Sequence, residues 1–350
     1  MSAAPTPWES YPIWHADYDA LRNLSEGYAK VMVLTDELVA RHVLNDFIQR
    51  AKLKEVPVVT LPPGESHKDI DHCRHIWDAM LRHGMDRQSL LINLGGGVIT
   101  DIGGFCASVY KRGIDFIHVP TTLLAMVDAA IGSKTGIDWR GYKNQIGTYC
   151  PPVAVFIDLR WLDTLPSSEV KNGVAEMLKI ALVADAELWS QLKDIEEVRD
   201  FCRWDYIERA IEQKRAIVRR DARDRGVRQI LNFGHTVGHA LESWYLHRSQ
   251  HIAHGHAVAI GMYYESRLSV AKAGLSSRAC DEIAGVLRRF FEIPAFSKDE
   301  ARELWRNMLF DKKTLRNTVY GVGLRSIGQA EWGVPFLEDE IVTLLSGAGK

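Results

Sequence analysis

Short apolar runs in the first half of the chain restrict its fold more than any other feature. Four of them have the length of buried strands, at residues 31–34, 56–61, 90–94 and 116–119. Pro57 is compatible with a strand only because it falls at the start of its run. Several runs are separated by a segment with helical spacing, such as residues 70–81. This succession of strand, helix and strand predicts a mostly parallel sheet with helices on both faces.

The pattern changes after about Leu165. Strand-like runs become rare, and apolar residues follow helical spacing at 170–183, 206–219 and 236–246. The chain of 350 residues is long enough for two cores. We therefore predict an α/β fold in two domains, with an α/β nucleotide-binding domain at residues 1–165 and a largely α-helical domain at residues 166–350.

The charge balance gives no support for a nucleic-acid or membrane partner. The 43 basic and 45 acidic residues leave a net charge of −2. No apolar run approaches the length of about 18 residues that a membrane span needs, and the N-terminal segment lacks the pattern of a secretory signal. The five cysteines are scattered and odd in number, which is typical of free thiols in a reducing compartment. We expect a cytoplasmic protein.

A glycine-rich segment directly follows the run at 90–94. It reads Gly-Gly-Gly-Val-Ile-Thr-Asp-Ile-Gly-Gly from Gly95 to Gly104 and opens a predicted helix. Glycines let the backbone approach a pyrophosphate, and the helix amino terminus offers N–H groups to it. The spacing is not that of the dinucleotide fingerprint, so a tight turn with close helix packing is an equal explanation. Thr121 and Thr122, which follow the next run, could bind a cofactor phosphate or ribose.

Two lysines further on lie in glycine-bearing segments. Lys134 and Lys143 are nine residues apart and follow Asp128, and we expect each to lie in a turn where both could converge on an anion. Surface lysines are common, so neither residue identifies a site alone.

A charged pair interrupts an apolar helical segment. Glu176 and Lys179 are three residues apart and share one helix face, while their neighbours from 174 to 183 are nearly all apolar. A solvated ion pair is the ordinary explanation. Burial is favoured here, and a buried charge needs a partner or a metal.

Histidines cluster further along the chain. His235 and His239 are four residues apart, and His251, His254 and His256 follow within 17 residues of His239. Glu176 with two imidazoles from separate elements would form a three-ligand catalytic metal site with an open position. Spacing alone does not decide which of the last three histidines is the ligand. Lys312 and Lys313, near the C-terminus, would by themselves be a solvated helix end.

These motifs, in this order, resemble the 3-dehydroquinate synthase family of sugar-phosphate cyclases. The resemblance spans about residues 31–328, and two stretches are specific to it: LINLGGGVITDIGGF with its continuation to KNQIG, and LNFGHTVGHALE followed by HGHAVAIGM. It implies a Rossmann-like N-terminal domain that binds NAD, a helical C-terminal domain, a homodimer and a divalent metal, zinc or cobalt. The metal ligands implied are Glu176, His235 and His254.

The resemblance also assigns the remaining site residues. The NAD contacts it implies are Gly64, Glu65, Lys68, Gly97, Val98, Ile99, Thr100, Asp101, Thr121, Thr122, Lys134, Lys143, Trp161, Leu162, Asp163 and Thr164. The substrate-binding and catalytic residues it implies are Asp128, Lys134, Asn144, Lys179, Lys214, Arg228, Asn232, His239 and Lys312 or Lys313, with Arg112 reaching across a dimer interface.

The implied reaction converts 3-deoxy-D-arabino-heptulosonate 7-phosphate to 3-dehydroquinate and phosphate, with no net redox change. A related cyclase of secondary metabolism could instead use sedoheptulose 7-phosphate or another sugar phosphate, such as glucose 6-phosphate, which lacks the carboxylate that Lys214 and Arg228 would bind. A metal-dependent polyol dehydrogenase or a binding protein without catalysis would also be compatible with parts of the pattern. Ser133, Asp224 and His256 replace the glycine and the two glutamates common in the family, which bears on the substrate more than on the reaction.

Overall fold

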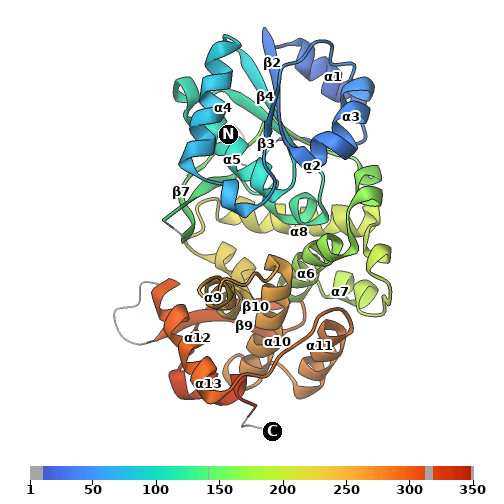
Figure 1. Cartoon of the computed structure of the whole chain (residues 1–350). Coiled ribbons are helices and arrows are strands. Elements are labelled where there is room, and N and C mark those ends of the chain that lie inside the picture. The colour runs from blue at the N-terminus through green and yellow to red at the C-terminus, as the bar shows by residue number, and fades with distance from the viewer. Residues whose placement is uncertain (1–10, 141, 312–317, 348–350) are drawn as a thin grey trace, which may run out of the picture. The chain divides into compact units, whose positions relative to one another are not determined.

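The computed structural model divides into two compact units, Met1–Glu169 and Val170–Lys350 (Figure 1). It describes residues 11–140, 142–311 and 318–347. Among the helices of these ranges, none is both long enough and apolar enough to cross a membrane.

A six-stranded parallel sheet forms the centre of the first unit. Its order is β1-β8-β5-β4-β2-β3. The strands are β1 (Ile13–His15), β2 (Lys30–Asp36), β3 (Val58–Leu61), β4 (Ser89–Gly95), β5 (Asp115–Pro120) and β8 (Ala154–Ile157). The four strands and the parallel sheet expected from the apolar runs are therefore present, and Pro57 lies just before β3. Every residue of β4 is buried, because the sheet is covered on both faces.

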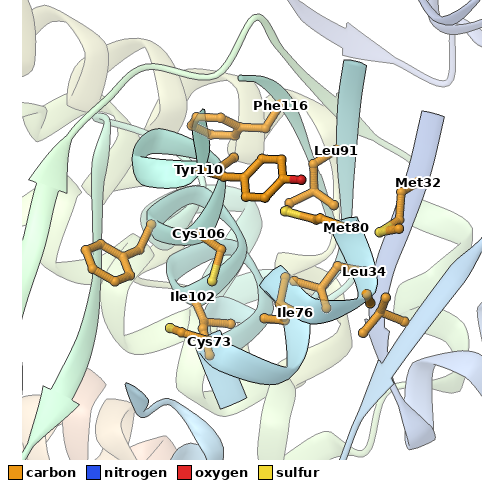
Figure 2. Close-up of a cluster of buried hydrophobic side chains, with 14 of the residues drawn as sticks. Met32, Leu34, Cys73, Ile76, Met80, Leu91, Ile102, Cys106, Tyr110 and Phe116 are labelled. Carbon is orange, nitrogen blue, oxygen red and sulfur yellow. The ribbon is translucent and has the colours of Figure 1, made fainter. Parts of the chain in front are cut away.

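Helices cover each face of this sheet and bury alternate strand residues. Helices α4 (Ile70–Arg82) and α5 (Gly97–Val109) pack against Met32, Leu34 and Leu91 on one face (Figure 2). Helices α1 (Tyr18–Glu26) and α3 (Asn45–Ala51) pack on the other face, where the core contains Val33, Leu90 and Ile92. The side-chain alternation of a strand explains why consecutive residues of β2 belong to different cores.

A two-stranded hairpin replaces the expected turns after Asp128. Strands β6 (Lys134–Trp139) and β7 (Tyr142–Tyr149) pair antiparallel, with Gly136 opposite Gly147. The expectation that Lys134 and Lys143 lie in turns was therefore wrong. A Cβ atom on Gly147 would lie 2.2 Å from the carbonyl oxygen of Thr135, so the glycines are explained by close strand pairing.

The second unit is mainly helical. It contains most of α6 (Ser167–Ala184), then α7 (Ala186–Leu192), α8 (Trp204–Arg220), α9 (His235–Leu246), α10 (His254–Lys272), α11 (Ser277–Phe290), α12 (Lys298–Asp311) and α13 (Glu338–Leu345). Nearly every residue in the central part of α6 is buried, as the apolar segment around Glu176 predicted. The hairpin of β9 (Val319–Ser326) and β10 (Gln329–Phe336) was not predicted.

Candidate functional site

The glycine turn lies at the carboxyl end of β4, where helix α5 begins. Gly96 is the residue before the helix and brings no side-chain cap. A Cβ atom on Gly95 would lie 2.6 Å from Cβ of Ile99, and one on Gly96 would lie 3.1 Å from Cγ2 of Thr122. After β3 the chain crosses to the other side of β2 to form β4, so the turn lies at a topological switch point of the sheet. Open α/β sheets bind nucleotides at such points.

The threonine pair lies beside this turn at the end of β5. The backbone N–H of Thr121 donates to the carbonyl of Gly95 at 3.0 Å. Thr122 Oγ1 accepts a hydrogen bond from the Ala125 N–H at 3.2 Å. Thr121 Oγ1 is buried without a hydrogen-bond partner among the described residues. A buried hydroxyl needs a hydrogen-bond partner, and the ribose or a phosphate of NAD bound at the glycine turn would supply one.

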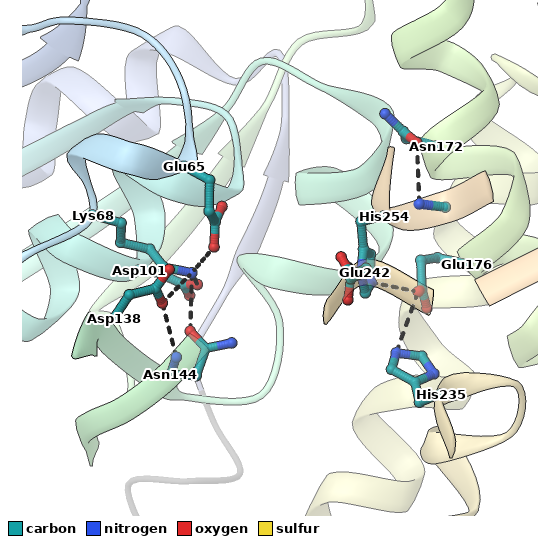
Figure 3. Close-up of polar contacts among 11 residues, drawn as sticks. Glu65, Lys68, Asp101, Asp138, Asn144, Asn172, Glu176, His235, Glu242 and His254 are labelled. Atoms are coloured by element: carbon teal, nitrogen blue, oxygen red, sulfur yellow. Dashed lines mark hydrogen bonds and ion pairs between the residues drawn. The ribbon is translucent and has the colours of Figure 1, made fainter. Parts of the chain in front are cut away.

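Lys68 is the centre of a polar cluster in the same unit (Figure 3). Only 3% of its side chain is exposed, and its ammonium lies 2.6 Å from Glu65 Oε1, 3.4 Å from Asp101 Oδ2 and 3.6 Å from Asp138 Oδ1. It also donates to Asn144 Oδ1 at 2.9 Å. Lys68 therefore ties the segment around Glu65 to helix α5 and to the β6–β7 hairpin.

The pKa values of Lys68 and Asp101 in this cluster differ from those of solvent-exposed side chains. Burial alone would lower the pKa of Lys68, but Asp101, Glu65 and Asp138 together raise it above its ordinary value. Burial raises the pKa of Asp101 to about 6, although the Lys68 ammonium opposes this change. Lys68 is thus a fixed cation beside the first turn of α5, whereas Asp101 can change charge near neutral pH.

The other residues expected to bind NAD differ in secondary structure and in exposure. Gly64 has φ +109°, Thr100 Oγ1 donates to the Gly97 carbonyl at 3.0 Å, and Val98 and Ile99 lie in the same first helical turn. Lys134 and Lys143 are exposed on the hairpin. In the 3-10 helix Leu159–Thr164, Trp161 and Leu162 are buried, whereas Asp163 and Thr164 are exposed.

A second site lies wholly within the helical unit. Glu176, His235 and His254 each offer a ligand atom, and these atoms lie within 4.8 Å of one another. They form the one group of three or more acidic, histidine or cysteine residues with metal-ligand spacing in the described part of the chain. The carboxylate comes from the middle of α6, and each imidazole comes from the first residue of a helix, α9 or α10.

The two imidazoles present the same nitrogen to the carboxylate (Figure 3). Nε2 of His254 lies 3.2 Å, and Nε2 of His235 3.6 Å, from Oε1 of Glu176. Their Nδ1 atoms face acceptors: Nδ1 of His235 lies 3.3 Å from the Phe233 carbonyl, and Nδ1 of His254 lies 3.3 Å from Oε1 of Glu242. An Nδ1–H that donates to such an acceptor leaves Nε2 free for a metal. The donor set of two imidazole nitrogens and one carboxylate oxygen fits a catalytic zinc ion.

Glu176 is completely buried, so its charge needs compensation. Burial alone would raise its pKa, but the Lys179 ammonium, with which it forms an ion pair, and the two imidazoles hold it well below the ordinary range. Burial and Lys179 lower the pKa of His235. Burial would also lower the pKa of His254, but Glu176 and Glu242 raise it to about 10. Without a metal, the group therefore holds an ionised Glu176 beside a protonated His254, and a metal ion would take the place of the proton on Nε2.

The amino end of α10 is fixed directly on α6. The Gly255 N–H donates to Oδ1 of Asn172 at 3.1 Å (Figure 3). A Cβ atom on Gly255 would lie 2.4 Å from Cα of Asn172, so the two backbones are in contact there. This contact positions His254, the residue before Gly255, against Glu176.

Several expected substrate residues are also in the helical unit. The ring of His239 lies 5.2 Å from that of His235 and 6.4 Å from that of His254, between ring centroids. Lys214 on α8 and Arg228 in the 3-10 helix Val227–Asn232 are buried cations, with 5% and 3% of their surface exposed. Asn232 ends that 3-10 helix. Nη1 of Arg228 donates to the Ala222 carbonyl at 2.9 Å.

The remaining expected substrate residues belong to the first unit or lie outside the described residues. Asp128 is in the short π-helical turn Ala125–Ala129, and Asn144 is on β7 with φ +53°. Arg112 is exposed and has φ +71°, next to Lys111 with φ +49°. Lys312 and Lys313 lie outside the described residues.

Sequence reasoning did not find Glu242, the carboxylate behind His254. Only 9% of its side chain is exposed. Its position was a usable signal, because it follows His239 by three residues and His235 by seven and so shares their helix face.

Comparisons with known proteins agree over most of the chain. Family models match in two parts, 3-dehydroquinate synthase N-terminal over residues 58–172 and 3-dehydroquinate synthase C-terminal over residues 173–314. A 3-dehydroquinate synthase from a Nitratiruptor species is 37% identical over 338 residues, which are 96% of this chain and 95% of that protein.

Two solved structures are similar over nearly the whole length. A 2-epi-5-epi-valiolone synthase from Streptomyces hygroscopicus subsp. jinggangensis 5008, with NAD+ and Zn2+ bound, has a TM-score of 0.84 at 27% identity and covers 99% of this chain and 98% of its own. A 2-deoxy-scyllo-inosose synthase with carbaglucose-6-phosphate, NAD+ and Co2+ has a TM-score of 0.83 at 22% identity, covering 97% and 96%. At that identity the second likeness supports the fold alone.

The two family models and the likeness to a solved 2-epi-5-epi-valiolone synthase place the chain in the class of sugar phosphate cyclases. Within that class, the chain belongs to the 3-dehydroquinate synthase family. The resemblance drawn from the motifs and the fold expected from them are both confirmed.

Proposed function

We propose that this chain is a 3-dehydroquinate synthase, a phosphate-eliminating cyclase that converts 3-deoxy-D-arabino-heptulosonate 7-phosphate to 3-dehydroquinate and phosphate. The observation that carries the proposal is the group of buried Glu176 with half-buried His235 and His254, whose ligand atoms lie within 4.8 Å of one another. Family membership and the 37% identity to a 3-dehydroquinate synthase support the same reaction. The enzyme would serve the shikimate pathway to aromatic amino acids.

We assign the metal to Glu176, His235 and His254, with zinc as the resident ion and cobalt as a substitute. We assign NAD to the glycine turn, to Thr121 and Thr122, and to the segment around Lys68. When bound, NAD supplies a reversible hydride acceptor, and the metal polarises the substrate hydroxyl that is oxidised. A ketone acidifies the neighbouring C–H bond, which permits loss of phosphate before the carbonyl is reduced again and an intramolecular aldol addition closes the ring.

The substrate carries a carboxylate and a phosphate, so the protein must supply fixed cations. In the proposal, Arg228 and Lys214 hold the carboxylate. Lys134, Asn232, His239 and one of Lys312 or Lys313 hold the phosphate. Buried cations suit this role because they lose little further hydration when the substrate binds, and both Arg228 and Lys214 are buried.

The protein is further proposed to act as a homodimer in the cytoplasm. The β6–β7 hairpin exposes Trp139, Tyr142 and Tyr149, at 42%, 63% and 40% of their surface, and exposed apolar residues of this kind are typical of interfaces. Arg112 would reach substrate phosphate in the partner subunit. All five cysteines are free thiols, which agrees with a reducing compartment.

The decisive experiment measures phosphate release from the seven-carbon keto acid phosphate and from sedoheptulose 7-phosphate, with NAD and zinc present. Sedoheptulose 7-phosphate tests for the activity of a related cyclase, an alternative suggested by the likeness to a 2-epi-5-epi-valiolone synthase. The proposal expects phosphate and 3-dehydroquinate only from the acid, without accumulation of NADH absorbance. Turnover of sedoheptulose 7-phosphate alone would assign the sister reaction, and stoichiometric NADH release would make the protein a dehydrogenase.

A further inference from the structure

Helix α9 begins without a capping side chain of its own. The residue before it is Gly234, which has φ +80° and no side chain to accept the first N–H groups. Glu265, from the neighbouring helix α10, accepts from the N–H groups on either side of the helix start instead. Its Oε2 accepts from the Gly234 N–H at 2.8 Å, and its Oε1 accepts from the Val237 N–H at 3.1 Å. Glu265 is completely buried, so this cap is part of the core.

The close approach of the two helices explains why the cap comes from a neighbour. A Cβ atom on Gly234 would lie 2.6 Å from Cγ of Met262 and 2.7 Å from the Val258 carbonyl oxygen. A Cβ atom on Gly261 would lie 1.8 Å from the Gly234 carbonyl oxygen. The usual capping residues Ser, Thr, Asp and Asn therefore cannot occupy position 234, and the carboxylate of Glu265 supplies the missing acceptors.

His235, the first residue of α9, lies in sequence between Gly234 and Val237, whose N–H groups Glu265 accepts. Its Nε2 lies 3.6 Å from Glu176, and its Nδ1 lies 3.3 Å from the Phe233 carbonyl just before the cap. The amino end of a helix carries a partial positive charge, which opposes the binding of a cation there. A carboxylate that accepts on both oxygens at that end offsets the helix charge and also fixes the backbone that holds the ring.

We propose that Glu265 is a positioning residue for the metal: it caps α9 from α10, holds His235 in place and neutralises the helix end beside a divalent cation. This inference rests on the proposed metal site. A residue behind a metal ligand acts on affinity for the ion, so the effect of replacing Glu265 is measurable without turnover.

The test compares zinc affinity of metal-free protein, measured by competition with a chromophoric chelator, for wild type, Glu265→Gln and Asp185→Asn. Asp185 is the control, because it is a buried carboxylate outside the metal group that caps another helix, α7, through the Glu187 and Leu188 N–H groups at 3.1 and 2.9 Å. It also forms an ion pair with Arg209 at 2.6 Å, so its replacement tests general destabilisation as well as the loss of a cap. We expect Glu265→Gln to weaken zinc binding about tenfold or more. Asp185→Asn should lower the thermal unfolding midpoint but leave the zinc affinity unchanged.

Equal zinc affinity in wild type and Glu265→Gln would overturn the inference, as would an equal loss of affinity in Asp185→Asn. If Glu265→Gln does not fold, Glu265→Asp replaces it. Aspartate keeps the carboxylate but is one methylene shorter, so weaker zinc binding is again expected. Wild-type zinc affinity in Glu265→Asp would contradict the inference. A wild-type protein that binds zinc no better than His254→Ala would instead refute the metal site itself.

Discussion

His254 and His256 are two residues apart but have different surroundings. Nε2 of His254 faces Glu176, whereas Nε2 of His256 is 2.8 Å from the Glu292 carbonyl and its ring packs 5.8 Å from Phe291. We therefore expect His254→Ala to lose stoichiometric zinc and activity, because one of three ligands is removed. His256→Ala should keep its zinc. Metal content by atomic emission spectrometry checks both variants, and the reverse pattern would show that the assignment is wrong.

Arg228 is the residue on which the choice of substrate depends. A guanidinium can hold a carboxylate with two parallel hydrogen bonds, which an ammonium cannot reproduce. Arg228→Lys should leave the carboxylate poorly paired and cost about 2–5 kcal/mol of binding, so the acid substrate should bind more than about tenfold more weakly.

The control for Arg228→Lys is a sugar phosphate without a carboxylate, tested for competitive inhibition or turnover. Its affinity should change much less than that of the acid. Equal losses for both compounds would mean that Arg228 is structural or binds phosphate.

Sequence patterns indicated Glu176 and a histidine cluster as a metal group, and the family resemblance named His235 and His254 within that cluster. The apolar neighbours of Glu176 correctly predicted its burial. Spacing could not choose among His251, His254 and His256, because the choice depends on where α10 begins and how it contacts Asn172. The role of Glu265 could not be predicted from the sequence, because a helix cap supplied by another helix leaves no local sequence pattern.

At the scale of elements, the contact between α5 and β4 depends on a glycine. A Cβ atom on Gly103 would lie 2.0 Å from Oδ1 of Asn93 and 2.9 Å from Cδ2 of Leu34. Gly103→Ala should lower the free energy of unfolding by about 1–3 kcal/mol, because the helix must move away from the sheet. Urea denaturation measures this loss.

Gly285→Ala is the matched control for Gly103→Ala. Gly285 is also inside a helix, α11, but a Cβ atom there would meet nothing within 4 Å. Alanine should therefore raise the free energy of unfolding by about 0.5–1 kcal/mol through helix propensity. Opposite signs for the two variants are expected, and a similar effect at both positions would contradict the packing argument.

Apolar runs made some elements predictable, although β8, which is buried at every residue, was not predicted. The apolar runs correctly located β2, β4 and β5, because strands covered on both faces need continuous apolar sequence. A fourth run located β3, although this edge strand is buried only at alternate residues. Strand β7 escaped notice because it is exposed almost throughout and lacks an apolar run. The expectation that strands are rare after Leu165 missed the β9–β10 hairpin. Strand β10 is mostly exposed, so its sequence has no apolar run to mark it.

At the scale of the whole molecule, a buried histidine links stability to pH. Burial lowers the pKa of His118, on β5, from its ordinary value of 6.5 to about 3. The folded state therefore excludes a proton that the unfolded chain binds. This contribution to stability is complete above pH 6.5 and is lost as the pH falls from 6.5 towards 3.

Wild-type protein should lose about 2 kcal/mol of unfolding free energy through this group between pH 7.5 and pH 5. His118→Gln cannot bind the proton, so its loss over the same interval should be smaller by that amount. Urea denaturation at the two pH values measures the difference, and identical losses would mean that His118 does not control this dependence.

The sequence pattern changes near Leu165. The structure divides into its two compact units between Glu169 and Val170. Helix α6 begins at Ser167 and continues across this point, so no loop marks it. A boundary inside a helix cannot be located to the residue by composition or spacing.

The contact of α9 with α10 at Gly234 and Gly261 has a consequence for the evolution of the chain. A single methyl group at Gly261 would collide with the Gly234 carbonyl, so this position has no neutral substitute. A substitution at Gly261 would displace the turn that precedes His235. Purifying selection on the chemistry should therefore act as strictly on these two glycines as on the histidines themselves, although neither glycine has a side chain with which to take part.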